Sequence, residues 1–80
     1  MQRNQTLHAL QIIFRDVLDS SGLQLREDLK PSDIQNWDSL THIGLITAIE
    51  KHYKIRFSLA ELDEIKNVGD IVSLIEKKSS

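Results

Sequence analysis

The sequence predicts an all-α fold: a four-helix bundle with three main helices, one short helix and a long first loop. Three observations predict it. Apolar residues recur at helical spacing over three stretches, helix-capping residues precede the later stretches, and only one short stretch alternates as a strand would. A chain of 80 residues has the size of one small domain, so we expect residues 1–80 to form a single unit.

Composition excludes several classes of function. Hydrophobic residues make up 40 % of the chain and charged residues 28 %, which is typical of a globular protein. No apolar run is long enough to span a membrane, and the start lacks the apolar core of a signal peptide, so we expect a cytoplasmic protein without membrane contact. The absence of cysteine excludes a disulfide, a thiolate zinc site and a thiol nucleophile. A net charge of −2 with scattered basic residues argues against nucleic-acid binding, and nothing suggests a stable oligomer, so we expect a monomer.

The first predicted helix is amphipathic and about four turns long. Charged residues at positions 15, 16 and 19 separate its apolar positions, and "SSG" at residues 20–22 is predicted to end it. Its apolar positions are Leu7, Leu10, Phe14, Val17 and Leu18.

An irregular stretch from Gly22 to Trp37 follows. It is polar and contains Pro31, but it also carries apolar residues, among them Leu25, Leu29, Ile34 and Trp37. A connection of this length is unusual unless it packs on the core or carries function. The simplest role for Trp37 is to hold this loop on the bundle.

The second predicted helix runs from about Ser39 to Tyr53, and Asp38 is well placed to cap it. Its apolar residues are expected to form one stripe, which would make this helix the most buried element. The expected stripe comprises Leu40, Ile43, Ile46, Ile49 and Tyr53, broadened by Leu45 and Ala48.

Two further helices are predicted near the end of the chain. Ser58 and Glu61 form a capping-box pattern before a short helix with Leu62 and Ile65. Asn67 with Asp70 then opens the last helix, whose buried face is expected to comprise Val68, Ile71, Val72 and Ile75. The alternating stretch "YKIRFSL" has no partner strand and is interpreted as a linker.

Ser39 allows several interpretations from local sequence. Serine and aspartate are both favoured at helix starts, so a capping role is the simplest. A hydrolase would use Ser39 with His42 and Asp38, but neighbouring side chains on one helix supply no oxyanion hole or cleft. A metal site formed by His8, His42 and His52 lacks ligand spacing, and solvated histidines are the simpler interpretation.

From about Leu25 to Ile75 the chain resembles the acyl carrier protein family. The resemblance rests on "DSL" at residues 38–40 opening the second helix, on the upstream "LREDL" and "WDSL", and on "VGDIVSLI" at residues 68–75. The apolar spacing between these segments also agrees, as do the length, the acidity, the helix order and the long first loop. The matching residues of the second helix and beyond are Ile43, Leu45, Ile46, Ile49, Glu50, Tyr53, Ile65 and Val68.

The resemblance implies a carrier of the free-standing type that is not an enzyme. Ser39 would bear 4′-phosphopantetheine, attached by a phosphopantetheinyl transferase that uses magnesium and coenzyme A. Acyl intermediates of fatty-acid, polyketide or related biosynthesis would be carried as thioesters between acyl-activating, acyltransferase or synthase enzymes. The residues expected at partner contacts are Asp38, Leu40, Ile43 and Glu50.

The sequence departs from many acyl carrier proteins in its charges. Thr41 and Gly44 stand where such helices often carry acids, and Glu50 is followed by Lys51. We therefore expect partner electrostatics to be weaker or differently patterned than in an acidic fatty-acid carrier. Gly44 could permit close approach by a partner or by the first loop, although a neutral glycine needs no such role. His42, just past Ser39, could contact a partner phosphate or the attached arm, although a solvated side chain is the simpler interpretation.

Three alternatives to an acyl carrier stay open at this point. A peptidyl or aminoacyl carrier would use the same fold and serine. A helical interaction module would use Ser39 only as a cap, and a helix-turn-helix DNA-binding protein would need a basic recognition helix that the chain lacks. An acyl chain could also enter the bundle, between residues that equally suit a plain core: Ile46, Ile49, Ile65 or Ile71.

Overall fold

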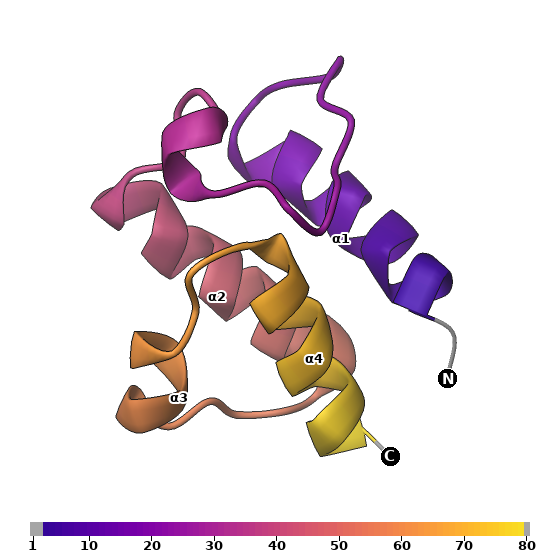
Figure 1. Ribbon diagram of the computed structural model, residues 1–80, viewed down its shortest axis with the longest axis vertical. Coiled ribbons are helices and arrows are strands. Elements are labelled where there is room, and N and C mark those ends of the chain that lie inside the picture. Colours follow the sequence, from indigo (N-terminus) through magenta and orange to yellow (C-terminus); the bar gives the residue numbers. More distant parts are fainter. Residues whose placement is uncertain (1–2, 80) are drawn as a thin grey trace.

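The computed structural model describes residues 3–79, and in this part of the chain it contains helices and no strand. The predicted all-α four-helix architecture is confirmed, with three main helices, one short helix and a long first connection (Figure 1). None of the helices in the described residues is long and apolar enough to cross a membrane. The helices are α1 Arg3–Val17, α2 Ser39–Tyr53, α3 Leu59–Asp63 and α4 Val68–Ser79, with a single 3₁₀ turn, η1, at Pro31–Asp33.

Helix α1 packs against both α2 and α4, while the short α3 lies on the other side of the bundle (Figure 1).

The predicted end of the first helix at "SSG" is wrong in its detail. The helix ends at Val17, and the left-handed residue after it is Asp19 with φ of 52°, not Gly22. An aspartate tolerates this conformation better than most residues, so it serves where a glycine was expected.

The connection between α1 and α2 packs on the core, as its length and apolar content predict. The apolar side chains at positions 25, 29, 34 and 37 are buried, and Leu23 is partly buried. Its backbone is also tied to the helices. Gln11 Oε1 accepts from the amide of Leu25 at 2.8 Å, and the carbonyls of Glu27 and Leu29 accept from the first amides of α4 at 2.8 and 2.9 Å. The loop therefore holds the entrance of α2 at a fixed place on the bundle.

The predicted apolar stripe of α2 is only partly buried. Leu45, Ile46 and Ile49 face the core, whereas Leu40 and Ile43 are 78 % and 65 % exposed. The expectation that α2 is the most buried helix is therefore wrong, because α4 buries five of its 12 residues and α2 three of its 15. The predicted buried face of α4 is confirmed, with Val68, Ile71, Val72 and Ile75 fully buried.

Gly44 lies in the middle of α2 where that helix approaches α1. A Cβ built on Gly44 would meet Val17 Cγ1 at 3.4 Å, which is ordinary van der Waals contact. Gly44 therefore lies against α1 and not against the first loop.

The linker follows the predicted pattern, and the short helix does so in part, because α3 ends at Asp63 and leaves Ile65 outside it. Residues 54–58 are not part of a strand, and Ser58 caps α3 by accepting from the amide of Glu61 at 3.2 Å. Asn67 Oδ1 accepts from the amide of Asp70 at 2.9 Å, as expected for the start of α4. Lys78 pairs with Glu61 at 2.8 Å and so ties α4 to α3.

Candidate functional site

Ser39 is the first residue of α2, and its side chain is exposed. The residue that caps the helix is Asp38, whose Oδ1 accepts from the amides of Leu40 at 3.0 Å and Thr41 at 2.9 Å. Thr41 Oγ1 accepts in return from the amide of Asp38 at 2.8 Å. These two residues satisfy the free amides of the helix start, so the Ser39 hydroxyl is not the cap.

Asp38 is held in its ionised form by this arrangement. The hydrogen bond from the Thr41 backbone, and then those from the Thr41 side chain and the Leu40 backbone, keep the pKa of Asp38 below its ordinary value of 3.8 despite some desolvation. Amides that donate to a carboxylate stabilise the charged form, and the positive end of the helix acts in the same direction.

Replacing Asp38 with asparagine is expected to lower stability at neutral pH but not in acid. The folded-state pKa of Asp38 is depressed, so its contribution is present above the ordinary value and is lost as pH falls through the folded value. Asparagine caps helices well but carries no charge at any pH. Urea denaturation of wild type and Asp38→Asn over a pH series should show their difference shrinking in acid. A constant difference would mean that the charge contributes nothing.

Trp37, directly before the cap, joins the site to the core. It is 5 % exposed and packs edge-on against Phe14, with ring centroids 5.1 Å apart. Its Nε1–H donates to His42 Nδ1 at 3.0 Å, and the two rings are stacked with centroids 6.0 Å apart. Trp37 thus holds the loop on the bundle as predicted. His42 is half-buried and bonded to Trp37, so the interpretation of a simply solvated histidine is wrong.

A groove of about 490 Å³ opens beside Ser39. Apolar side chains form most of its wall, and Asp38, Ser39 and His42 contribute polar groups. The groove residues are Pro31, Trp37, Asp38, Ser39, His42, Ile43 and Ile65. The sequence predicts His42 near Ser39 on the same helix, but it does not predict Pro31 there, because Pro31 belongs to the 3₁₀ turn η1.

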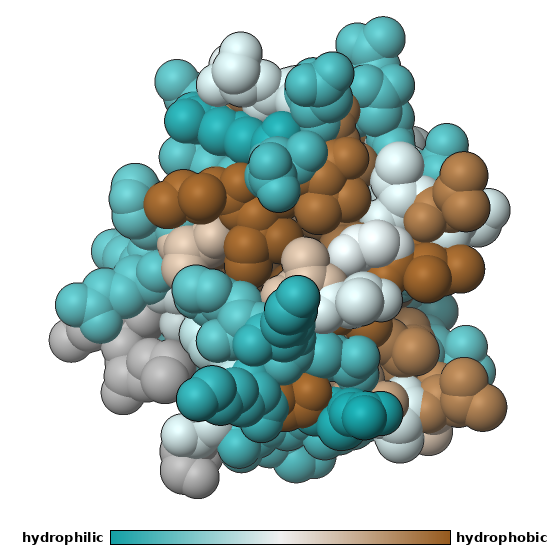
Figure 2. All heavy atoms as spheres, turned by 180° about the vertical axis from the view of Figure 1, so that it is seen from behind, coloured by the Kyte–Doolittle hydropathy of each residue, from teal (hydrophilic) through white to brown (hydrophobic). Residues whose placement is uncertain are grey.

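Leu40 and Ile43 extend from the first two turns of α2 into solvent. In Figure 2, apolar side chains gather along the right-hand edge of the molecule, where α2 begins and α3 lies. Leu59 of α3 adds another exposed side chain, at 83 %. The exposed side chains of Leu40 and Ile43, close to Ser39 along α2, are suited to protein contact.

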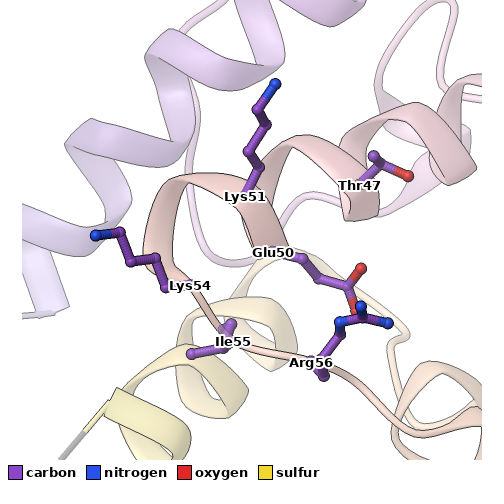
Figure 3. A pocket seen from close by; sticks show the side chains of 6 residues that line it. All are labelled: Thr47, Glu50, Lys51, Lys54, Ile55 and Arg56. Atoms are coloured by element: carbon purple, nitrogen blue, oxygen red, sulfur yellow. The ribbon is translucent and has the colours of Figure 1, made fainter.

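Glu50 has an internal role in the structure. Its Oε2 accepts from the amide of Phe57 at 2.8 Å, which fixes the linker after α2. Around it lies a second cavity of about 480 Å³, formed by Thr47, Glu50, Lys51, Lys54, Ile55 and Arg56. Figure 3 shows the Glu50 carboxylate beside Arg56, while Lys51 and Lys54 extend from α2 in different directions. This end of α2 is therefore basic, and a partner contact at Glu50 stays a prediction.

The arrangement gives no support to a hydrolase or a metal site. The carboxylate of Asp38 faces backbone amides, and His42 Nδ1 is bonded to Trp37, so the Ser39, His42 and Asp38 side chains form no relay. Within residues 3–79, no group of three or more histidine, aspartate or glutamate side chains is placed to hold a metal ion.

Of the residues considered for an internal acyl chain, Ile46, Ile49 and Ile71 are buried in the packed interior. Ile65 is half-buried and lies on the wall of the groove beside Ser39.

Comparison with known proteins links this chain to one family. A family model described as "Phosphopantetheine attachment site" matches residues 8–75. The chain is 33 % identical over 76 residues to an acyl carrier protein of Thermotoga maritima, covering 95 % of this chain and 94 % of that protein. It is 37 % identical over 60 residues to an acyl carrier protein of Phytoplasma mali, covering 75 % and 69 %.

The fold agrees with this similarity. The solution NMR structure of a holo acyl carrier protein from Geobacter metallireducens superposes with a TM-score of 0.87 at 49 % sequence identity, covering 91 % of this chain and 84 % of that one.

Proposed function

Because the chain belongs to the phosphopantetheine-attachment family of acyl carrier proteins, we propose that Ser39 bears 4′-phosphopantetheine and that acyl groups are carried there as thioesters. The observation that supports Ser39 is its position. It is exposed at the first residue of α2, and Asp38 performs the capping that would otherwise occupy a serine hydroxyl.

Attachment is a phosphoryl-group transfer carried out by a separate transferase. The Ser39 Oγ forms a bond to the phosphorus of the phosphopantetheine part of coenzyme A, and the bond from that phosphorus to 3′,5′-ADP breaks. The serine proton passes to a base of the transferase, and magnesium balances the charge on the phosphates. One equivalent of coenzyme A therefore yields one phosphodiester and one 3′,5′-ADP.

The start of α2 suits an anionic phosphodiester. Helix α2 has 15 residues, and its dipole places positive charge at the end where Ser39 lies. The exposed side chains of Leu40 and Ile43 flank the position and offer apolar contacts to the transferase. The N-terminal region of α2 is therefore the proposed docking surface.

The protein acts as a carrier and not as an enzyme. The attached group supplies the thiol that this cysteine-free chain lacks, and a flexible tether raises the effective concentration of its cargo at each partner enzyme. The partners are the transferase and enzymes that load, transfer or condense acyl groups. We further propose that the carrier is a cytoplasmic monomer formed by one domain.

The charges of α2 bear on the choice of partner. Glu50 is the only acid of α2, and its carboxylate binds the amide of Phe57, while Lys51 and Lys54 are exposed at the end of the helix. A partner whose basic surface binds an acidic second helix would make few ion pairs with α2. We therefore propose partners whose docking surfaces are less basic than those of enzymes that bind acidic carriers.

The test is the intact mass of the purified protein before and after incubation with coenzyme A, magnesium and a broad-specificity phosphopantetheinyl transferase. We expect a gain of one phosphopantetheine, and fragmentation of the modified peptide should locate it on Ser39. A known carrier treated in parallel is the control for the transferase. If that control is modified while this folded chain is not, or if the group is found on another residue, the proposal is wrong.

A further inference from the structure

The hydrogen bond between Trp37 and His42 has no part in the attachment reaction as described above. Trp37 is buried, so its indole N–H needs an acceptor inside the protein, and His42 Nδ1 provides it at 3.0 Å. An alanine or leucine at position 42 is compatible with a helix but would leave the Trp37 N–H unpaired.

The contact decides which nitrogen of His42 carries the proton. An indole N–H only donates, so Nδ1 must accept, and in the neutral ring the proton then resides on Nε2. Burial lowers the pKa of His42, which keeps the ring neutral at physiological pH. Acceptance of the indole proton at Nδ1 favours the same neutral form. His42 thus has a fixed Nε2–H donor left for another partner.

His42 is part of the wall of the groove beside Ser39. Residues three apart on a helix are neighbours, with Cβ atoms about 5–6 Å apart, so Ser39 and His42 share one face of α2. Both line the groove of about 490 Å³, together with the apolar side chains of Pro31, Ile43 and Ile65.

We propose that His42 is an arm-binding residue: its Nε2–H donates a hydrogen bond to a phosphodiester oxygen on Ser39, and the apolar wall of the groove receives the dimethyl-substituted carbon chain that follows the phosphate. This inference rests on the proposed attachment at Ser39 and adds the residue that orients the attached group. Trp37 acts through His42, since it fixes the ring and its tautomer.

The charges around the groove are compatible with this role. Asp38 is the one other titratable group among the residues that line it, and its carboxylate is engaged by the amides of Leu40 and Thr41. The side chains contributed by η1, by the loop at Trp37 and by the link from α3 to α4 carry no charge. The phosphodiester therefore meets the neutral donor at His42, and no lysine or arginine along this wall competes for it.

The experiment is an NMR comparison of the unmodified protein and the protein carrying phosphopantetheine. In the unmodified protein, nitrogen-15 shifts should show the Nε2–H tautomer of His42. After attachment the pKa of His42 should rise, because a nearby negative charge favours the imidazolium. A phosphodiester does not itself titrate near neutral pH, so its phosphorus-31 resonance should move with the same midpoint as His42. His52, near the other end of α2, is the internal reference ring.

The variant His42→Gln separates binding from packing. Glutamine still offers an oxygen to the Trp37 N–H and a donor to the groove, but it cannot titrate. The modified variant should keep its fold, and its phosphorus resonance should no longer change near neutral pH. A resonance that still titrates in the variant, or a His42 ring in wild type that is unaffected by attachment, would overturn the inference.

The mass of each NMR sample separates the two proposals. If the arm is present and His42 does not respond, only the role of His42 is wrong. If wild type gains no arm, the carrier proposal fails and the role of His42 fails with it.

Discussion

Replacement of Ser39 with alanine is expected to abolish attachment of phosphopantetheine completely while changing the free energy of unfolding by no more than about 0.5 kcal/mol. The loss is total because alanine has no oxygen to form the bond to phosphorus. The fold is unaffected because Ser39 is exposed and Asp38 performs the capping of α2. Intact mass after treatment with coenzyme A and the transferase measures the first effect, and urea denaturation measures the second.

Ser58 provides a matched control for this variant. It is also an exposed serine at the start of a helix, but it is the cap of α3 and accepts from the amide of Glu61 at 3.2 Å. Ser58→Ala should therefore lose about 1 kcal/mol of stability and still gain the arm fully. If both variants lost stability and both kept the modification, Ser39 would be an ordinary residue of the helix start and another residue would bear the arm.

The contrast between Ser39 and Ser58 shows what local sequence could predict. The bounds of α2 were predicted correctly because Asp38 is a strong cap signal followed by a long apolar pattern. The cap of α3 was predicted for the same reason. Such signals act over a few neighbouring residues, so they need no knowledge of the tertiary structure.

The resemblance placed Leu40 and Ile43 at partner contacts, but the helical periodicity by itself could not predict their exposure. Helix α2 is apolar on more than one side, and periodicity alone does not tell which side faces the other helices. The bundle buries the side with Leu45, Ile46 and Ile49, because α1 and the core lie there. The remaining apolar side chains are left at the surface, close to Ser39.

The contact of His42 with Trp37 was not predicted, because the two residues belong to different structural segments. Trp37 lies in the loop and His42 on the helix, and only the turn at Asp38 brings the two rings together. A tryptophan directly before a helix cap, followed by a histidine five positions later, is a usable signal in retrospect. It becomes informative once the tryptophan is known to be buried.

The second large effect is expected from Trp37→Ala. Removing a buried aromatic side chain of this size costs about 3–5 kcal/mol. A domain of 80 residues has a total stability of roughly 4–12 kcal/mol, so this one change removes a large part of it. The cavity would lie between Phe14 and the groove, and His42 Nδ1 would lose its donor. Urea denaturation followed by circular dichroism should show the lowered midpoint.

Trp37→Phe distinguishes packing from hydrogen bonding at the same position. Phenylalanine keeps an aromatic ring against Phe14 but has no N–H for His42, so we expect a smaller loss, of about 1–2 kcal/mol. The tautomer of His42 should also become mixed in this variant, because nothing then requires Nδ1 to accept. If the phenylalanine variant were as unstable as the alanine variant, the hydrogen bond to His42 and not the packing of the ring would account for the stabilisation by Trp37. If neither variant were destabilised, the loop would be held to the bundle by its other buried side chains, at Leu25, Leu29 and Ile34.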